Sequence, residues 1–143
     1  MQTIDEAQDG LIEEFGYLPD WLDRYQQLID LARTLPAPPE SLHRDENLIK
    51  GCQSRVWISC EEKGGALHFC VDSDAIITKG IAALLVKILD GHTPEEVAHA
   101  NLYVIDRIGL KENLSPTRAN GLLAMLDRIR ECATSRLASH LKS

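Results

Sequence analysis

The sequence predicts a single α+β domain, in which a small antiparallel sheet is flanked by helices on both sides along the chain. Residues 55–60 and 66–71 alternate apolar and polar side chains, which is typical of half-buried strands. The polar "EEKGG" at 61–65 separates these two runs and predicts a hairpin turn. Elsewhere apolar residues recur every three or four positions, as in amphipathic helices. The length of 143 residues suits one domain, so we assign residues 1–143 to it.

Two helices are expected before the sheet. Thr3 and Glu6 have the spacing of a capping box, so the first helix should begin after Thr3 and end near Gly16. Asp20 should cap the second helix. Residues 36–47 are rich in proline and polar side chains, which stops the second helix and predicts an ordered surface loop.

The two strands should pair antiparallel, each with one apolar face, in a sheet of two or three strands in all. The apolar positions are Val56, Ile58 and Cys60 in the first strand and Leu67, Phe69 and Val71 in the second.

A central helix should follow the sheet. The "DSD" at 72–74 offers an N-cap for a helix over 75–90. This helix is apolar on nearly every side, which predicts that it is buried. Gly91 fits the left-handed position that commonly follows a helix.

Three further helices should complete the chain. "TPEE" at 93–96 combines a cap, a first-turn proline and a capping-box glutamate. Another helix is expected near 102–109. Ser115 should cap the last helix, with Pro116 in its first turn, and the helix should run to about residue 140.

The composition excludes several classes of protein. The formal net charge of −7 argues against a nucleic-acid-binding protein, which needs a basic surface. The longest apolar run, residues 81–86, is far shorter than the ~20 residues that span a bilayer. The acidic start does not resemble a secretory signal, so we expect a cytoplasmic protein. The helical stripes can all be buried within one chain, so we also expect a monomer.

The four cysteines, at positions 52, 60, 70 and 132, lack a close C-x-x-C pair, so zinc and redox motifs are not indicated. In the cytoplasm they should be reduced, and no disulfide is expected. Cys60, in a strand, and Cys132, in the last helix, are interpreted as buried structural residues.

Cys52 differs because it follows Gly51 at the entrance to a strand. A thiol on a glycine-hinged loop can be sheltered in one state and presented in another. Nearby cations (Lys50, Arg55, His43 and Arg44) would lower its pKa if the fold brings them close. A cysteine that merely packs at the strand edge is the alternative.

Other polar residues give weaker signals. Asp72 and Asp74 could be paired catalytic carboxylates, although helix capping explains them more simply. The five histidines do not form a metal-binding set. Arg118 lies in the first turn of a helix, which is unfavourable for a cation. This indicates an ion pair, a contact with a partner, or a solvated surface side chain.

Four segments together resemble one known family, the SufE sulfur acceptors. They span nearly the whole chain, in the family's order. They are "LPDWLDRYQQLIDLARTLP", "NLIKGCQSRVWISC", "DSDAIITKGIAALL" and "LSPTRANGLLAML". The G-C-Q-S-x-V-W block in the second is the most specific of the motifs.

The resemblance implies a fold similar to SufE and to the IscU scaffold. It also implies that Cys52 accepts persulfide sulfur from a cysteine desulfurase, SufS- or CsdA-like, and passes it on for iron–sulfur cluster assembly. The next acceptor would be, for example, a SufB-containing scaffold. The chain would carry no metal and no cofactor; the desulfurase would carry pyridoxal phosphate. It would activate the desulfurase rather than act as an enzyme itself. The supporting or partner-contacting residues would be Gly51, Gln53, Ser54, Asp74, Lys79 and Arg118.

Three other functions remain open. In a metal or cluster scaffold, Cys52 would hold iron or zinc together with Cys60, Cys70 or His68. A thiol peroxidase would turn over peroxide without a desulfurase. In a pure adaptor, Cys52 would be inert.

Overall fold

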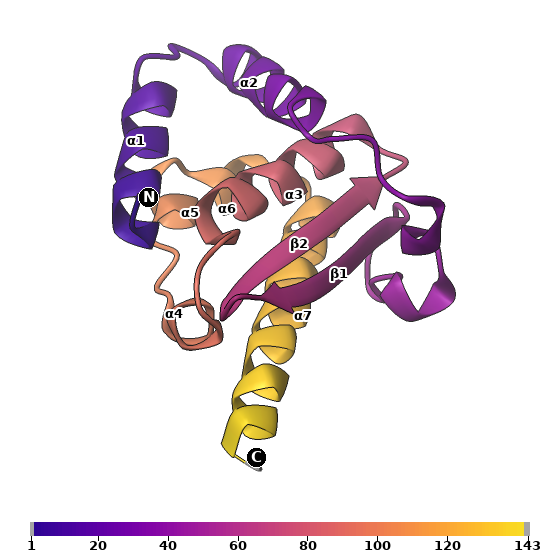
Figure 1. Cartoon of the computed structure of the whole chain (residues 1–143). Helices are drawn as coiled ribbons and strands as arrows, with labels where there is room; N and C mark the ends of the chain where they lie inside the picture. Colours follow the sequence, from indigo (N-terminus) through magenta and orange to yellow (C-terminus); the bar gives the residue numbers. More distant parts are fainter. Residues whose placement is uncertain (1, 142–143) are drawn as a thin grey trace.

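The computed structural model describes residues 2–141, so residues 1, 142 and 143 of the predicted domain lie outside it. It is an α+β fold, as predicted (Figure 1). The elements are α1 (Ile4–Gly16), α2 (Trp21–Arg33), the short 3₁₀ helices η1 (Glu40–Leu42) and η2 (Asp45–Asn47), β1 (Val56–Lys63), β2 (Ala66–Ser73), α3 (Ile76–Leu89), α4 (Pro94–His99), α5 (Val104–Arg107), α6 (Leu110–Asn113) and α7 (Pro116–Leu141).

The sheet within the described residues is a two-stranded antiparallel hairpin. Its register runs from Val56 opposite Ser73 to Lys63 opposite Ala66. The connection is Gly64-Gly65, with both φ angles positive, as a two-residue hairpin turn of this kind requires. The predicted apolar faces are confirmed: Val56, Ile58, Leu67, Phe69 and Val71 are buried, and Cys60 packs partly buried against the same core.

Helix α3 lies at the centre of the molecule, with the hairpin on one side and contacts to α1, α2 and α7 on others (Figure 1). The prediction that it is buried is confirmed, since most of its apolar side chains are inaccessible. Gly80 allows α2 to approach closely. A Cβ atom at this position would collide with the backbone carbonyl of Leu28.

Several helix ends follow the sequence prediction. Thr3, Asp20 and Thr93 each accept a hydrogen bond from the backbone N–H three residues later. Gly91 follows α3 with a φ of 82°. The helix expected near 102–109 is present but shorter, as α5, and Gly109, in the left-handed conformation, separates it from a further short helix, α6.

The expected cap of α3 is wrong. Its N-cap is Ala75, and no side chain bonds the first turn. β2 stays extended through Ser73, so neither aspartate is placed to cap. Asp74 instead accepts a hydrogen bond from the Arg55 N–H, and Asp72 pairs with Lys79.

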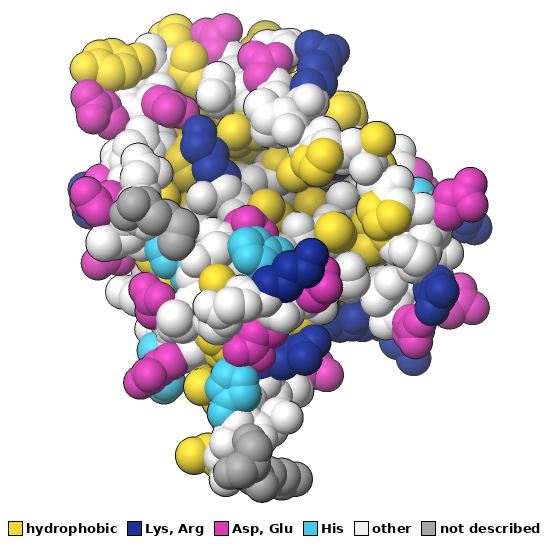
Figure 2. Space-filling view, viewed as in Figure 1, with side chains coloured by type: hydrophobic (Ala, Val, Ile, Leu, Met, Phe, Trp, Pro, Cys, Tyr) yellow, Lys and Arg dark blue, Asp and Glu magenta, His cyan; other side chains and the backbone are white. Residues whose placement is uncertain are grey.

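The proline-rich connection after α2 is ordered, as expected. Its residues 35–39 lie along β2 and line a small groove of about 60 Å³ with Phe69, Cys70 and Val71. Figure 2 shows charged side chains of both signs spread over this face, with hydrophobic side chains gathered toward its middle.

Helix α7 crosses behind the hairpin, and its last turns project beyond the other elements (Figure 1). Among residues 2–141, no helix has both the length and the apolar character needed to span a bilayer.

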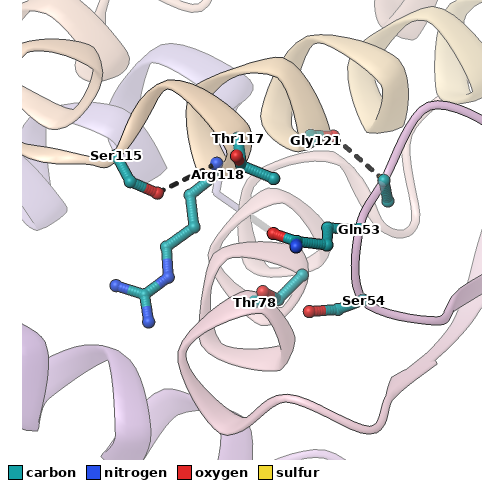
Figure 3. A pocket seen from close by; sticks show the side chains of 8 residues that line it. Gln53, Ser54, Thr78, Ser115, Thr117, Arg118 and Gly121 are labelled. Atoms are coloured by element: carbon teal, nitrogen blue, oxygen red, sulfur yellow. Dashed lines mark hydrogen bonds between the residues drawn. The ribbon is translucent and has the colours of Figure 1, made fainter.

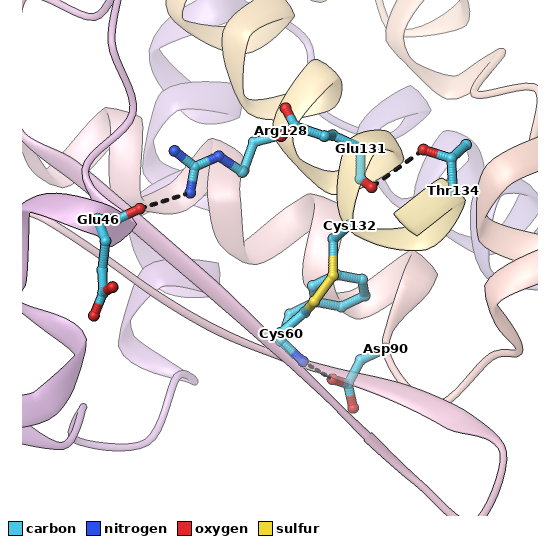
Figure 4. Close-up of a disulfide and its surroundings, with 8 residues drawn as sticks. Glu46, Cys60, Asp90, Arg128, Glu131, Cys132 and Thr134 are labelled. Atoms are coloured by element: carbon cyan, nitrogen blue, oxygen red, sulfur yellow. Dashed lines mark hydrogen bonds between the residues drawn. A yellow bond between two sulfur atoms is a disulfide. The ribbon is translucent and has the colours of Figure 1, made fainter. Parts of the chain in front are cut away.

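A disulfide joins Cys60 of β1 to Cys132 of α7 (Figure 4). The expectation that all four cysteines are reduced is therefore wrong for this pair. The two residues are 72 positions apart in the sequence, and only the packing of α7 across β1 brings them together. Cys52 and Cys70 are free.

Gly80→Ala should destabilise the fold, because the new Cβ collides with the α2 backbone rather than with a side chain that can move. We expect the free energy of unfolding to fall by about 1–3 kcal/mol in urea denaturation. Gly10→Ala is the matched control. Apart from the backbone of its own helix, nothing lies within 4 Å of its added Cβ, so it should raise stability by up to about 1 kcal/mol. Equal changes in the free energy of unfolding for the two substitutions would contradict the close approach of α2 to Gly80.

Reducing the Cys60–Cys132 bond should lower the free energy of unfolding by about 2–4 kcal/mol, because the bond restricts a long loop in the unfolded chain. Urea denaturation with and without a reductant measures the difference. Cys132→Ser should unfold identically under both conditions. If the reductant left the free energy of unfolding of the wild-type protein equally unchanged, the bond would contribute nothing to stability.

Candidate functional site

Cys52 lies on a short loop, residues 50–55, that leads into β1. The base of the loop is closed where the Ile49 N–H donates to the Val56 carbonyl at 2.8 Å. Gly51 has a φ of 90°, a conformation that favours glycine, so it shapes the turn that presents Cys52.

The far end of this loop is fixed by the start of the connection to α3. The Arg55 N–H donates to Asp74 Oδ1 at 3.0 Å, and the Ser73 hydroxyl donates to the Arg55 carbonyl at 2.8 Å. Asp74 therefore holds the backbone behind Cys52 rather than facing the thiol.

The Cys52 thiol is half-buried and points toward α7, where Sγ lies 3.8 Å from the Gly121 carbonyl oxygen. A Cβ atom at Gly121 would lie 3.4 Å from Sγ, so the missing side chain leaves room for the sulfur. A carbonyl accepts a hydrogen bond from a neutral thiol and repels a thiolate. The resting contact therefore favours the protonated form.

Burial raises the pKa of the Cys52 thiol above its ordinary value. The sequence instead suggested that nearby cations would lower it. His43 bonds Asp72, and Arg44 pairs with Glu46. Lys50 lines a different cavity.

Lys79 is also engaged away from the thiol. Its ammonium lies 3.2 Å from Asp72, which His43 contacts at 2.6 Å. Burial alone would raise the pKa of Asp72, but the hydrogen bonds from His43 and Lys79 outweigh it and lower the pKa. This cluster is an ion-pair network beside the hairpin, so its geometry supports a structural role for Lys79.

A cavity of about 440 Å³ adjoins the thiol and opens to the surface (Figure 3). Its lining is drawn from the Cys52 loop, α3 and the start of α7, and consists of Cys52, Gln53, Ser54, Thr78, Ser115, Thr117, Arg118 and Gly121. In Figure 3 Gln53 and Ser54 approach from the loop, and Arg118 extends from the opposite wall.

The structure thus brings Gln53, Ser54 and Arg118 together around Cys52. The guanidinium of Arg118 has no ion pair with any acid in residues 2–141, so an internal ion pair does not explain its place in the first turn of α7.

Sequence reasoning missed Thr78, Thr117 and Gly121 as site residues, and it interpreted Ser115 only as a helix cap. Thr78 gave one usable signal, since it is a hydroxyl residue within a largely apolar helix. Gly121 gave another, because glycine is unfavourable inside a helix and so suggests a close approach.

A metal site at Cys52 would need further ligands. Cys60 is bonded to Cys132, and neither Cys70 nor His68 lines the Cys52 cavity. Across residues 2–141, no group of three His, Cys, Asp or Glu side chains is arranged to hold a metal ion. The residues present around Cys52 therefore do not fit a metal or cluster.

Comparison with known proteins identifies similar sequences over most of the chain. The SufE model, described as "Fe-S metabolism associated domain", matches residues 9–133. An uncharacterized SufE-like protein of Rhizobium meliloti (strain 1021) is 39% identical over 134 residues, which cover 90% of this chain and 96% of that protein. The sulfur acceptor protein CsdE of Escherichia coli (strain K12) is 38% identical over 123 residues, covering 85% of this chain and 84% of that one.

A solved structure has a similar fold. The solution structure of a hypothetical protein from Thermus thermophilus matches with a TM-score of 0.77 at 28% sequence identity. The match covers 92% of this chain and 96% of that chain.

The raised pKa of Cys52 predicts slow alkylation. Below the folded-state pKa, the thiolate fraction of Cys52 is smaller in the folded protein than in the unfolded chain. In a Cys70→Ser background, iodoacetamide should therefore label Cys52 more slowly in the folded protein than in urea. The ratio of the labelling rate in urea to that in the folded protein should decrease as the pH rises through the pKa of Cys52 in the folded protein. A folded rate that levels off at a lower pH than the unfolded rate would mean that cations lower the pKa instead.

Proposed function

Because this chain belongs to the SufE family, which is associated with Fe-S metabolism, we propose that it transfers sulfur through a persulfide on Cys52. A cysteine desulfurase supplies the sulfur, and a protein that assembles iron–sulfur clusters receives it. The single observation that carries this proposal is the position of Cys52. It is a free thiol on a loop, beside a cavity that opens to the surface.

The chemistry is a thiol exchange. The Cys52 thiolate attacks the terminal sulfur of the donor's cysteine persulfide, the donor S–S bond breaks, and the donor cysteine leaves as a thiolate. The reaction needs a thiolate and access in line with the S–S bond, but no metal and no elaborate acid–base machinery.

The resting geometry explains how the Cys52 thiol is protected better than it explains how the thiol attacks a persulfide. Half-burial and the Gly121 contact keep the thiol protonated and poorly reactive. Docking of the donor must draw the thiol away from Gly121 and into the cavity, where it ionises. Such a requirement limits reaction with other electrophiles, because only a bound donor exposes the nucleophile.

The partners follow from the same chemistry. The donor is a SufS- or CsdA-like desulfurase that carries the pyridoxal phosphate, and the acceptor is a scaffold such as one that contains SufB. The protein acts in the cytoplasm as a monomer that activates the desulfurase, without turnover of its own.

Cys52→Ser should abolish sulfur transfer. After incubation with a desulfurase and [³⁵S]cysteine, wild-type protein should carry one sulfur on the Cys52 peptide and the variant none, as measured by intact mass and peptide mapping. Cys70→Ser is the matched control, because it removes the other free cysteine and should load like the wild type.

Two results would count against the proposal. Label on Cys52→Ser equal to that on the wild type would place the sulfur elsewhere. Full stimulation of the desulfurase by Cys52→Ser would make the protein an adaptor with an inert thiol.

A further inference from the structure

The cavity beside Cys52 is suited to an anion. The loop contributes the amide of Gln53 and the hydroxyl of Ser54, and Arg118 adds a positive charge from α7. No aspartate or glutamate is among the residues that line the cavity. The donors therefore face the cavity without a negative group to neutralise them.

Two helices begin at this cavity. α3 starts at Ile76 and contributes Thr78, and α7 starts at Pro116 and contributes Thr117. The N-terminal end of a helix carries a partial positive charge, since its first N–H groups lack partners within the helix. The two helix ends add to the charge of Arg118.

Thr78 adds an unpaired hydroxyl to the lining of the cavity. Its side chain is more than nine-tenths buried, and its hydroxyl has no hydrogen-bond partner among residues 2–141. Figure 3 shows this hydroxyl directed into the cavity. Because it faces an open cavity, this hydroxyl is available to donate a hydrogen bond to a group that enters the cavity.

The resting thiol does not use the Thr78 hydroxyl. It is directed at the Gly121 carbonyl, which favours the neutral form. A persulfide differs in length and in charge, because the added S–S bond, about 2 Å long, carries a terminal sulfur beyond Sγ. When that sulfur loses its proton it holds a full negative charge, and the cavity has ample room for it.

We propose that Thr78 and Arg118 bind the terminal sulfur of a Cys52 persulfide anion, so that the cavity retains the sulfur until transfer. Thr78 donates its hydroxyl hydrogen, and Arg118 supplies the compensating charge. This inference rests on the proposed function and assigns the group that holds the cargo.

The test loads sulfur without a desulfurase. In a Cys70→Ser background, the Cys52 thiolate attacks a sulfur of inorganic polysulfide; one S–S bond forms, another breaks, and a shorter polysulfide leaves with the electron pair. After desalting, cyanide attacks the terminal sulfur of the persulfide, which leaves as thiocyanate and restores the Cys52 thiolate. The rate of thiocyanate release measures how firmly the sulfur is held.

Thr78→Val and Thr78→Ser form a matched pair, because the first keeps the shape and removes the hydroxyl, whereas the second keeps the hydroxyl. We expect Thr78→Val to release sulfur about tenfold faster than the parent protein, as the loss of a hydrogen bond to a charged group implies. Thr78→Ser should release it within about twofold of the parent rate. Arg118→Gln should accelerate release in the same direction as Thr78→Val.

The outcomes separate the two proposals. Equal release rates in the parent, Thr78→Val and Thr78→Ser proteins would overturn the inference, as would a Thr78→Ser rate matching that of Thr78→Val. If a desulfurase places no sulfur on Cys52 while polysulfide-loaded protein shows the expected order of rates, the proposed function fails and the anion site stands.

Discussion

The burial of α3 is the constraint on which the rest of the structure depends. Its apolar surface leaves nearly no face for solvent, so the hairpin, α2 and α7 must all pack around it. Gly80 sets how closely α2 can approach. With the hairpin on one side of α3 and α7 beside it, the loop entering β1 meets the start of α7. The meeting of Cys52 with Gly121 is therefore a result of core packing.

Local sequence signals predicted most of the fold. Capping residues such as Thr3, Asp20 and Thr93 act within one helical turn, and strand alternation acts within a few residues, so both can be recognised without the tertiary structure. The cap of α3 at Ala75 could not be recognised in this way. Asp72 and Asp74 have other roles, which depend on partners that only the hairpin and the connection before it bring close.

The candidate site was predictable only in part, because sequence signals identify near neighbours in the chain but not residues that packing brings together. The motif around Cys52 identified the thiol together with Gln53 and Ser54, which are its neighbours in the chain. Thr78 and Gly121 come from separate helices, and their convergence on Cys52 is a property of packing. The direction in which the thiol's pKa moves was also out of reach, because charge near in sequence suggested one sign and burial in the structure gives the other.

The Cys60–Cys132 bond closes a covalent ring that contains β2, α3 and most of α7, Gly121 included. Cys52 lies just outside that ring, on the amino-terminal side. Gly121 therefore lies within the covalently closed ring, whereas Cys52 lies on a loop outside it whose two ends are held by hydrogen bonds alone. An outward movement of the Cys52 loop would therefore strain no covalent bond of the ring. Gly121 would keep its position, and the thiol could return to the same contact.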